Sequence, residues 1–201
     1  MRTLTRAEAS PLPHIVLLAA LALALIAFGF YLRTLHPGVG PSFKLDSIEL
    51  QIAVVTQGII HPPGSPQYLM LGRLATILLP GPSLAYHLNL FSALCGAATV
   101  AVLFLLSYRL GHNAVAAGFA ALSYGLAIRV WHQSSISELY TLNALYIALT
   151  LYLLVTWHQT RQHGLYWAAA AIYAFSFGNH VSMILLLPAF VYMVFATDRR
   201  M

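Results

Sequence analysis

Long apolar segments with almost no charge are the feature that most limits how this chain can fold. The run from Ile15 to Leu32 carries no charged side chain, and it approaches the roughly 20 apolar residues that a helix needs to cross a bilayer. Of the 201 residues only 7% are charged, and the mean hydropathy is +0.77. Soluble domains carry about 25% charged residues. The sequence therefore predicts an all-α polytopic membrane protein.

The apolar runs predict about six membrane spans in a single transmembrane domain over residues 1–201. We expect the first run to stay as a helix rather than act as a signal peptide, because no small-residue cleavage site closes it. Further spans are predicted at 87–108, 115–130 and 139–157, with a polar break at 131–135. The last apolar segment, 166–194, is interrupted by Gly178-Asn179-His180. We interpret it as two short spans that meet there, and one long kinked span is the alternative.

Residues 33–85 form a long connection without a full span, and such a length is uncommon unless the segment has a function. Within it the sequence predicts an amphipathic helix over 43–57 and a rigid corner at 61–64, His-Pro-Pro-Gly. A short apolar helix is predicted over 68–79. It is too short to span, so we expect it at the membrane interface, with Arg73 reaching toward the head groups.

The basic residues of the loops favour a cytoplasmic N-terminus. The side of the N-terminus would hold most of them: Arg2, Arg6, Arg109, Arg161, Arg199 and Arg200. The opposite side would hold Arg33, Lys44, Arg73 and Arg129. This orientation places the polar candidates Asp46, Glu49, His61, Glu138 and His180 together on the extracytoplasmic side. We interpret this convergence as the mark of a functional site in an integral membrane protein, expected in a bacterial inner membrane.

Asp46 and Glu49 are two of only five acidic residues in the chain. Their spacing puts both carboxylates on one face of the predicted helix, while Leu45, Ile48, Ile52 and Val55 mark the other face. The same spacing fits a helix N-terminus with Asp46 as the cap and Glu49 as its reciprocal partner. Since an acid near hydrocarbon is costly, its presence favours a function, and we take Asp46 and Glu49 as candidate catalytic residues.

Glu138 has two interpretations as well. With Ser135 it fits a capping box at the start of the fourth span, and it could instead be a second carboxylate in a polar cleft, paired with Arg129. We take Glu138 and Arg129 as candidate substrate-binding residues on the second interpretation.

The histidines do not predict a metal site. His61, His132 and His180 lie in separate segments and lack the close spacing of a helical zinc pair, so no metal is expected. We interpret His61 and His180 as residues that line a cleft and bind substrate through hydrogen bonds. The sequence also lacks P-loop, GxGxxG, GxSxG and CxxC patterns, which argues against a nucleotide-driven pump, a dinucleotide enzyme and a nucleophile-elbow hydrolase.

Several of these residues form an ordered set of motifs. They are Phe43-x-x-Asp46-Ser47-x-Glu49-Leu50, His61-Pro62-Pro63-Gly64-x-Pro66-x-Tyr68-x-x-x-Gly72, Leu88-Asn89-Leu90-Phe91-Ser92-Ala93-Leu94, Trp131-x-Gln133, Glu138-x-Tyr140-x-Leu142-Asn143 and Gly178-Asn179-His180. The set resembles an uncharacterised-domain family of polytopic membrane proteins whose animal relatives are transmembrane O-mannosyltransferases of the endoplasmic reticulum. The resemblance covers most of residues 30–190.

The resemblance implies a fold and an activity. It implies a GT-C type glycosyltransferase that moves a sugar from a polyprenyl-phosphate carrier to an acceptor hydroxyl of a protein, lipid or glycan on the extracytoplasmic face. By position in the first loop, Asp46 would be the catalytic carboxylate, with Glu49 as the second candidate. Arg73 and Arg129 are our choices for stabilising the lipid phosphate. Family members usually have more helices, so the chain looks like the N-terminal part of such a protein.

Two other functions remain open at this point. A transporter or flippase for a lipid-linked substrate would also explain polar residues beside a broken helix pair. A non-catalytic membrane subunit or fragment would need a partner membrane chain to complete the fold. Nucleic acid is not an expected partner, because the basic residues are scattered and form no basic run.

Overall fold

The computed structural model describes residues 11–39 and 45–198, and within them every regular element is helical. The elements are α1 (His14–Arg33), α2 (Leu45–Thr56), α3 (Pro66–Leu78), α4 (Leu84–Gly111), α5 (Ala114–Gly125), α6 (Ile128–Ser134), α7 (Leu139–Thr160), α8 (His163–Ser176), the 3-10 helix η2 (Val181–Leu186) and α9 (Leu187–Thr197).

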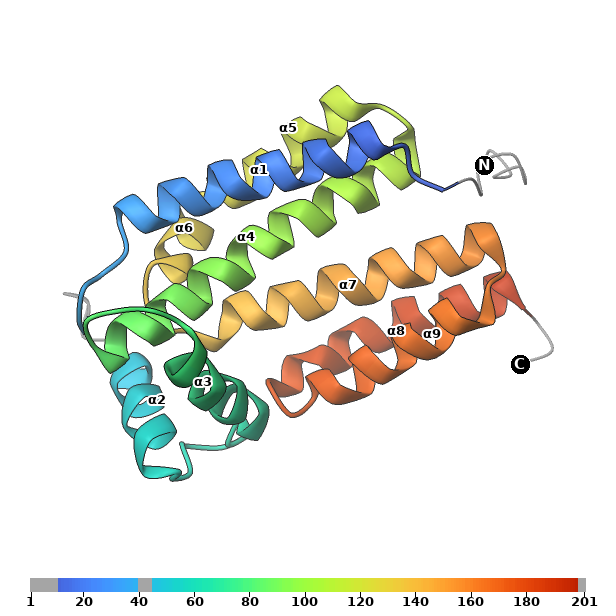
Figure 1. Cartoon of the computed structure of the whole chain (residues 1–201). Coiled ribbons are helices and arrows are strands. Elements are labelled where there is room, and N and C mark those ends of the chain that lie inside the picture. The colour runs from blue at the N-terminus through green and yellow to red at the C-terminus, as the bar shows by residue number, and fades with distance from the viewer. Residues whose placement is uncertain (1–10, 40–44, 199–201) are drawn as a thin grey trace.

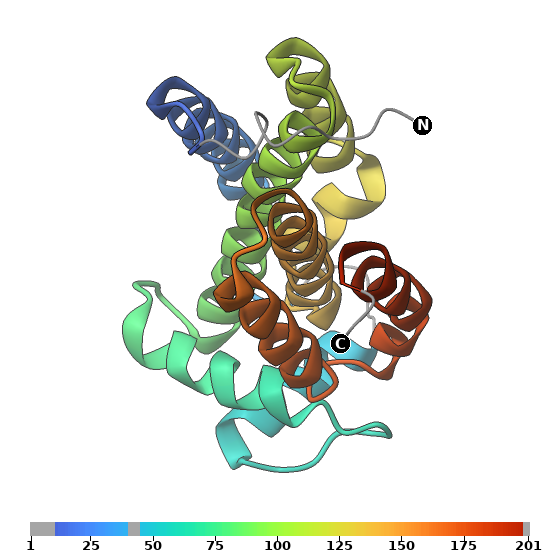
Figure 2. The same cartoon turned by 90° about the vertical axis from the view of Figure 1, so that its right-hand side faces the viewer.

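The long helices lie alongside one another, and α2 and α3 close one end of the bundle (Figure 1). The start of α1 and the end of α9 lie at the opposite end. Viewed along the bundle, α8 and α9 both lie beside α7, while α1 and α5 lie near α4 (Figure 2). The bundle therefore presents one end that is built from the 45–78 segment.

Helix α4 is the centre of the packing. One apolar cluster joins it to α1 and α5, and a second joins it to α7, α8 and α3. Close contact depends on glycine, because a Cβ added at Gly96 would lie 2.3 Å from Ser134 Oγ. Small residues let helices approach in this way in membranes, where hydrophobic burial between helices gives little driving force. The small residues Gly96 and Ala97 of α4 are both buried.

Three helices, α1, α4 and α7, are long and apolar enough to cross a membrane, and the bent pair α5 and α6 would make a fourth. The protein is accordingly a helical integral membrane protein. The tail after 160 forms two short antiparallel helices rather than one kinked helix (Figure 1). The apolar helical segment Val181–Thr197 is shorter than the helices that can cross a membrane. The total of six spans therefore remains a prediction.

The span predicted at 115–130 is not one continuous helix, although the two helices that form it are together long and apolar enough to cross a membrane. Helix α5 ends at Gly125, α6 begins at Ile128, and the two are bent by 64°. The Tyr31 hydroxyl donates a hydrogen bond to the Gly125 carbonyl oxygen at 2.7 Å, and Val100 lies where a Cβ of this glycine would be. The carbonyl is thus satisfied outside the helix, and the break falls before the polar segment 131–135, most of which is helical.

Helices α2 and α3 match the predicted segments closely, but the outward face of α2 is not the expected one. Ile52 and Val55 are exposed, while Ser47, Leu50 and Gln51 are buried. A membrane reverses the usual preference, since apolar side chains can face lipid while polar ones are satisfied inside. Between the helices the chain turns at Gly64, whose φ of +90° suits a residue without a Cβ.

Candidate functional site

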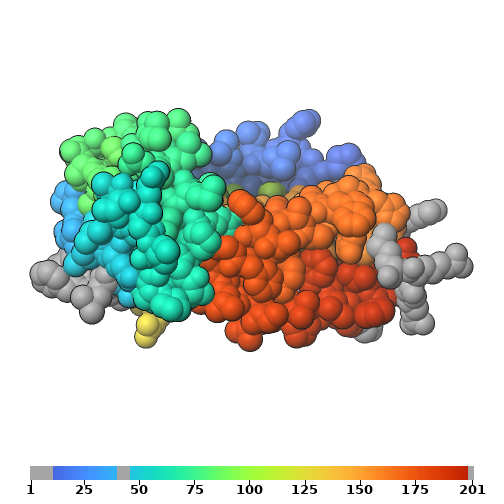
Figure 3. All heavy atoms as spheres, turned by 90° about the horizontal axis from the view of Figure 1, so that it is seen from below, coloured from blue at the N-terminus to red at the C-terminus, as the bar shows by residue number. Residues whose placement is uncertain are grey.

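The end of the bundle brings together segments that are far apart in sequence. Helix α2, the 57–65 loop, the α6–α7 connection and the turn between α8 and η2 all lie there (Figure 1). The backbone amide of Gln67 donates to the Gly178 carbonyl at 3.0 Å, which fixes α3 against that turn. On the surface, the α2–α3 segment adjoins the orange segment that contains α8 (Figure 3). These segments carry Asp46, Glu49, His61, Glu138 and His180, so all five predicted residues lie at one end of the molecule, and the side of the membrane on which that end lies stays a prediction.

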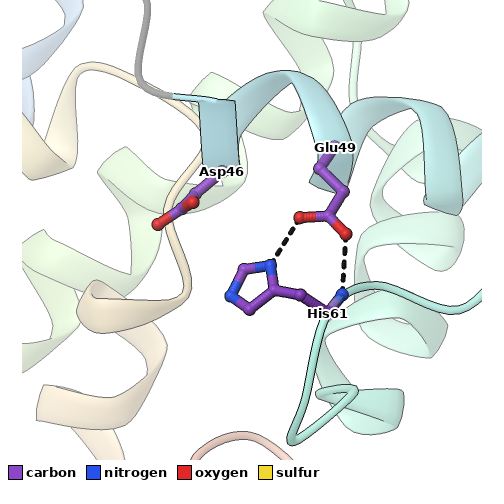
Figure 4. A group of neighbouring side chains, drawn as sticks. All are labelled: Asp46, Glu49 and His61. Atoms are coloured by element: carbon purple, nitrogen blue, oxygen red, sulfur yellow. Dashed lines mark hydrogen bonds and ion pairs between the residues drawn. The ribbon is translucent and has the colours of Figure 1, made fainter.

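Glu49 and His61 form a two-point contact. Glu49 Oε1 accepts a hydrogen bond from the His61 backbone amide at 2.6 Å, and Oε2 lies 2.5 Å from His61 Nδ1 (Figure 4). This pairing lowers the pKa of Glu49, chiefly through the side-chain hydrogen bond from His61, and raises the pKa of His61 for the same reason. The carboxylate thus ties the first turns of α2 to the loop before the Pro-Pro corner.

Asp46 lies beside this pair in the first turn of α2. Its carboxylate, one oxygen of Glu49 and one ring nitrogen of His61 all lie within 4.8 Å of one another. The two acids share a face, as their spacing predicts, and both point to the side of the helix where His61 lies (Figure 4). A capping box does not describe them, because α2 already begins at Leu45 and Glu49 is bound to His61. A carboxylate in the first turn also interacts favourably with the helix dipole.

A buried polar network holds α2 in place from the other side. Ser47 Oγ donates to Glu138 Oε1 at 3.2 Å, and Gln51 Nε2 donates to Ser137 Oγ at 2.8 Å. Ser137 in turn donates to Asn89 Oδ1 at 2.6 Å. All of these side chains are less than a tenth exposed. Buried polar groups that are satisfied in this way fix one arrangement, because losing a partner leaves an unpaired group in a low dielectric.

The contacts of Glu138 are ones that neither sequence interpretation named. It occupies the N-cap position of α7 but its side chain makes no capping hydrogen bond, so the predicted capping box is wrong. It is 1% exposed and accepts the Ser47 hydroxyl instead. No ion pair within 4 Å joins it to Arg129 in the described part of the chain. Glu138 is buried and holds α2 through Ser47, and a substrate-binding role for it stays a prediction.

The two arginines chosen for the phosphate lie in different pockets. Arg129 lines a pocket of about 270 Å³ with Tyr124, Val130, Gln133, Tyr140 and Thr141, beside the α5–α6 bend. Arg73 lines one pocket of about 400 Å³ between α2 and α3, and another of about 470 Å³ with Thr76 and His87. The structure does not bring the two guanidinium groups into one pocket.

His180 lies next to Tyr140, a residue that lines the Arg129 pocket. Its ring lies 5.7 Å from that of Tyr140, which lines the pocket, and its Nδ1 accepts the Ser182 backbone amide at 3.1 Å. It is the N-cap of η2. His180 therefore has a structural role at the turn, in addition to its position behind the pocket wall.

Sequence reasoning missed two features of this site. The network through Asn89 and Ser137 was not anticipated, although Asn89 stands out as an amide within an apolar span. The direct contact of His61 with Glu49 was also missed, because the histidines were compared only with one another as possible metal ligands. The signal that could have indicated it is Gly58, which follows the predicted helix and lies only three residues before His61.

Comparisons with known proteins agree with the motifs. The chain matches the family described as the Protein O-mannosyl-transferase TMEM260 N-terminal domain over residues 46–201. Protein O-mannosyl-transferase TMEM260 of Mus musculus is 34% identical over 133 residues, which cover 66% of this chain and 19% of that relative. Protein O-mannosyl-transferase tmem260 of Dictyostelium discoideum is 22% identical over 185 residues, or 84% of this chain and 22% of that relative.

The chain spans about a fifth of the length of these curated relatives. No solved structure gives a significant match to it. The family match begins at Asp46 and continues through every segment of the site described above. The resemblance seen in the motifs is confirmed, and the chain belongs to the TMEM260 N-terminal domain family of protein O-mannosyl-transferases.

Proposed function

We propose that this chain carries the acidic site of a membrane glycosyltransferase of GT-C type, which moves a sugar from a polyprenyl-phosphate donor to an acceptor hydroxyl. The observation that carries the proposal is the pair of carboxylates on one face of α2, held at the end of a membrane bundle. The names of the relatives, protein O-mannosyl-transferase, support a glycosyl transfer and favour a protein as the acceptor.

The proposed chemistry needs a base, and Asp46 is the better placed of the two acids. Glu49 is bound at both oxygens by His61, whereas no hydrogen bond to the Asp46 carboxylate occurs among the described residues. Asp46 takes the proton of the acceptor hydroxyl, and the hydroxyl oxygen bonds to the anomeric carbon of the sugar. The bond from that carbon to the phosphate oxygen breaks, and its electrons leave with the lipid phosphate.

The leaving lipid phosphate needs positive charge rather than an acid. Arg129 is our first choice for this role, since its pocket also offers the Gln133 amide and aromatic walls from Tyr124 and Tyr140. A guanidinium group beside hydrogen-bond donors suits a phosphate monoanion or dianion. Arg73, which lines separate pockets on α3, is the alternative.

The location of the site relative to the membrane is also part of the proposal. The bias of Lys and Arg supports an extracytoplasmic α2–α3 end and a cytoplasmic N-terminus. A bacterial inner membrane was the expectation from sequence, and the curated relatives named above are eukaryotic. Fractionation of the native cells would decide which membrane holds the protein.

Purified protein in lipid nanodiscs, incubated with a polyprenyl-phosphate mannose and a Ser- and Thr-containing peptide, tests the proposal. We expect a peptide product with a new glycosidic bond, identified by mass spectrometry. A flippase is the second candidate, because the 64° break between α5 and α6 resembles the discontinuous helices of transporters. Movement of the donor across vesicle membranes without any glycosylated product would favour the flippase and contradict the transferase.

A further inference from the structure

The side chains of Asp46, Glu49 and His61 could also act together as ligands of a metal ion. They are the one group of three potential metal ligands found in residues 11–39 and 45–198. Asp46 and Glu49 project from neighbouring turns of α2, and His61 lies on the loop that faces this side of the helix (Figure 4). Their ligand atoms lie within 4.8 Å of one another, so small side-chain rotations would bring all three around one ion.

Glu49 is held in an orientation that suits a ligand. The His61 backbone amide binds Oε1 at 2.6 Å, while Oε2 faces His61 Nδ1 at 2.5 Å. A cation that replaces the proton between Oε2 and Nδ1 would bind both atoms at once. The amide would then keep the carboxylate oriented, which is what outer hydrogen bonds do at metal sites.

The charge of the group also favours a cation. No Lys or Arg in the described part of the chain lies within 4 Å of the Asp46 or Glu49 carboxylate. Two ionised carboxylates and a neutral imidazole carry a charge of about −2, which one divalent ion balances. Asp46 supplies oxygen lone pairs to which no described residue donates. The three residues are partly exposed, so an ion can reach them and keep bound water.

We propose that Asp46, Glu49 and His61 bind one divalent cation of the Mn²⁺ or Mg²⁺ class. Two carboxylate oxygens with one imidazole nitrogen suit Mn²⁺, and water would fill the remaining positions of a six-coordinate ion. Cation binding does not depend on the proposed function, but a role in catalysis rests on it. Asp46 can ligate through one oxygen and face the acceptor hydroxyl with the other, and the ion places positive charge near the leaving phosphate.

A titration of the purified full chain with Mn²⁺ tests the site without any turnover. Electron paramagnetic resonance measures the binding, because the signal of the free ion is lost when the ion binds. We expect one saturable Mn²⁺ per chain, displaced by excess Mg²⁺. His61→Ala and Glu49→Gln should each weaken binding by more than the roughly 10–100-fold effect of losing an outer-shell partner. His163→Ala is the matched control, since that exposed histidine begins α8 at the other end of the bundle and should leave binding unchanged.

Circular dichroism and size-exclusion profiles confirm that the variants fold, and Glu49→Gln keeps the shape of the native side chain. Absence of saturable Mn²⁺ binding, or equal binding by the wild-type chain and His61→Ala, overturns the proposed site. Intact binding together with no transfer of sugar contradicts the proposed function and leaves the cation site standing. Transfer that survives removal of the ion by EDTA shows that a bound cation has no part in catalysis.

Discussion

At the scale of single residues, the face of α2 that carries Asp46 and Glu49 is held in place by contacts on the buried side of the helix, above all that of the Ser47 hydroxyl. Ser47 lies between Asp46 and Glu49 in sequence but points to the opposite side of α2, where it donates to the buried Glu138. A buried carboxylate that loses a donor is left less well solvated, at a cost of about 1–3 kcal/mol. The acids can stay exposed at the surface because Ser47 and Gln51 anchor the helix behind them.

We predict that Ser47→Ala lowers both stability and transfer activity. The expected loss is about 1–3 kcal/mol of unfolding free energy, measured by thermal unfolding in detergent, with a parallel fall in sugar transfer. Thr56→Ala is the matched control, because its exposed hydroxyl donates only to the Ile52 carbonyl of its own helix. If both variants lose stability equally, the contact with Glu138 does not hold α2.

Part of this geometry was predictable from sequence, but the hydrogen-bond partners of the residues were not. The shared face of Asp46 and Glu49 follows from helical spacing alone. By contrast, Glu49 and His61 are separated by a loop, and a pattern of single residues does not specify how such a loop folds back. The capping box at Ser135 and Glu138 was wrong because a Ser-x-x-Glu pattern does not specify where a helix begins, and α7 begins after Glu138.

At the scale of helices, glycines decide how closely α4 approaches its neighbours. Gly96 lies against Ser134 of α6 and Tyr31 of α1, and the Gly125 carbonyl is bound by the same tyrosine. An alanine at position 96 would bring its Cβ within 2.3 Å of Ser134 Oγ, so this close contact needs a glycine. The break after Gly125 was not predicted, because it depends on a hydroxyl that is ninety-four residues away in the chain.

We predict that Gly96→Ala destabilises the bundle by about 1–3 kcal/mol, since the added methyl would overlap Ser134 and force the helices apart. Gly29→Ala in α1 is the control, because no heavy atom lies within 4 Å of its added Cβ. Thermal unfolding of both variants in the same detergent measures the difference. Similar midpoints for the two would show that the α4–α6 contact is loose.

At the scale of the whole molecule, α2 and α3 lie at one end of the bundle and the α7–α8 connection lies at the other (Figure 1). Hydropathy predicted the helical membrane architecture well, because apolar length is a property of the sequence itself. The number of spans stays a prediction, since helices as short as α8 and α9 do not by their length show whether they cross the bilayer.

Cysteine labelling tests the orientation. Cys95 is the single cysteine of the chain and is buried, so Cys95→Ala gives a background without thiols. In that background, Gln57→Cys after α2 should react with an impermeant maleimide from outside the cell. Gln162→Cys, in the α7–α8 connection, should react only after the membrane is opened. Both glutamines are exposed. The reverse pattern would place the acidic site on the cytoplasmic side.

The central claim is that the carboxylate of Asp46 acts as the general base of sugar transfer, and Asp46→Asn tests it most directly. Asparagine keeps the size and most of the hydrogen bonding of aspartate, and it can still offer an oxygen to a cation, but it has no basicity. The rate of sugar transfer to peptide should be compared with the wild type in nanodiscs, with saturating Mn²⁺ and equal amounts of correctly inserted protein.

The proposed role predicts a fall in rate of about 10²–10⁴-fold, which is the usual contribution of a general base. Glu49→Gln, measured in parallel, should retain more activity, because Glu49 is engaged by His61. A folded Asp46→Asn protein that transfers sugar at the wild-type rate would contradict the account, and α2 would then be a scaffold rather than the catalytic element.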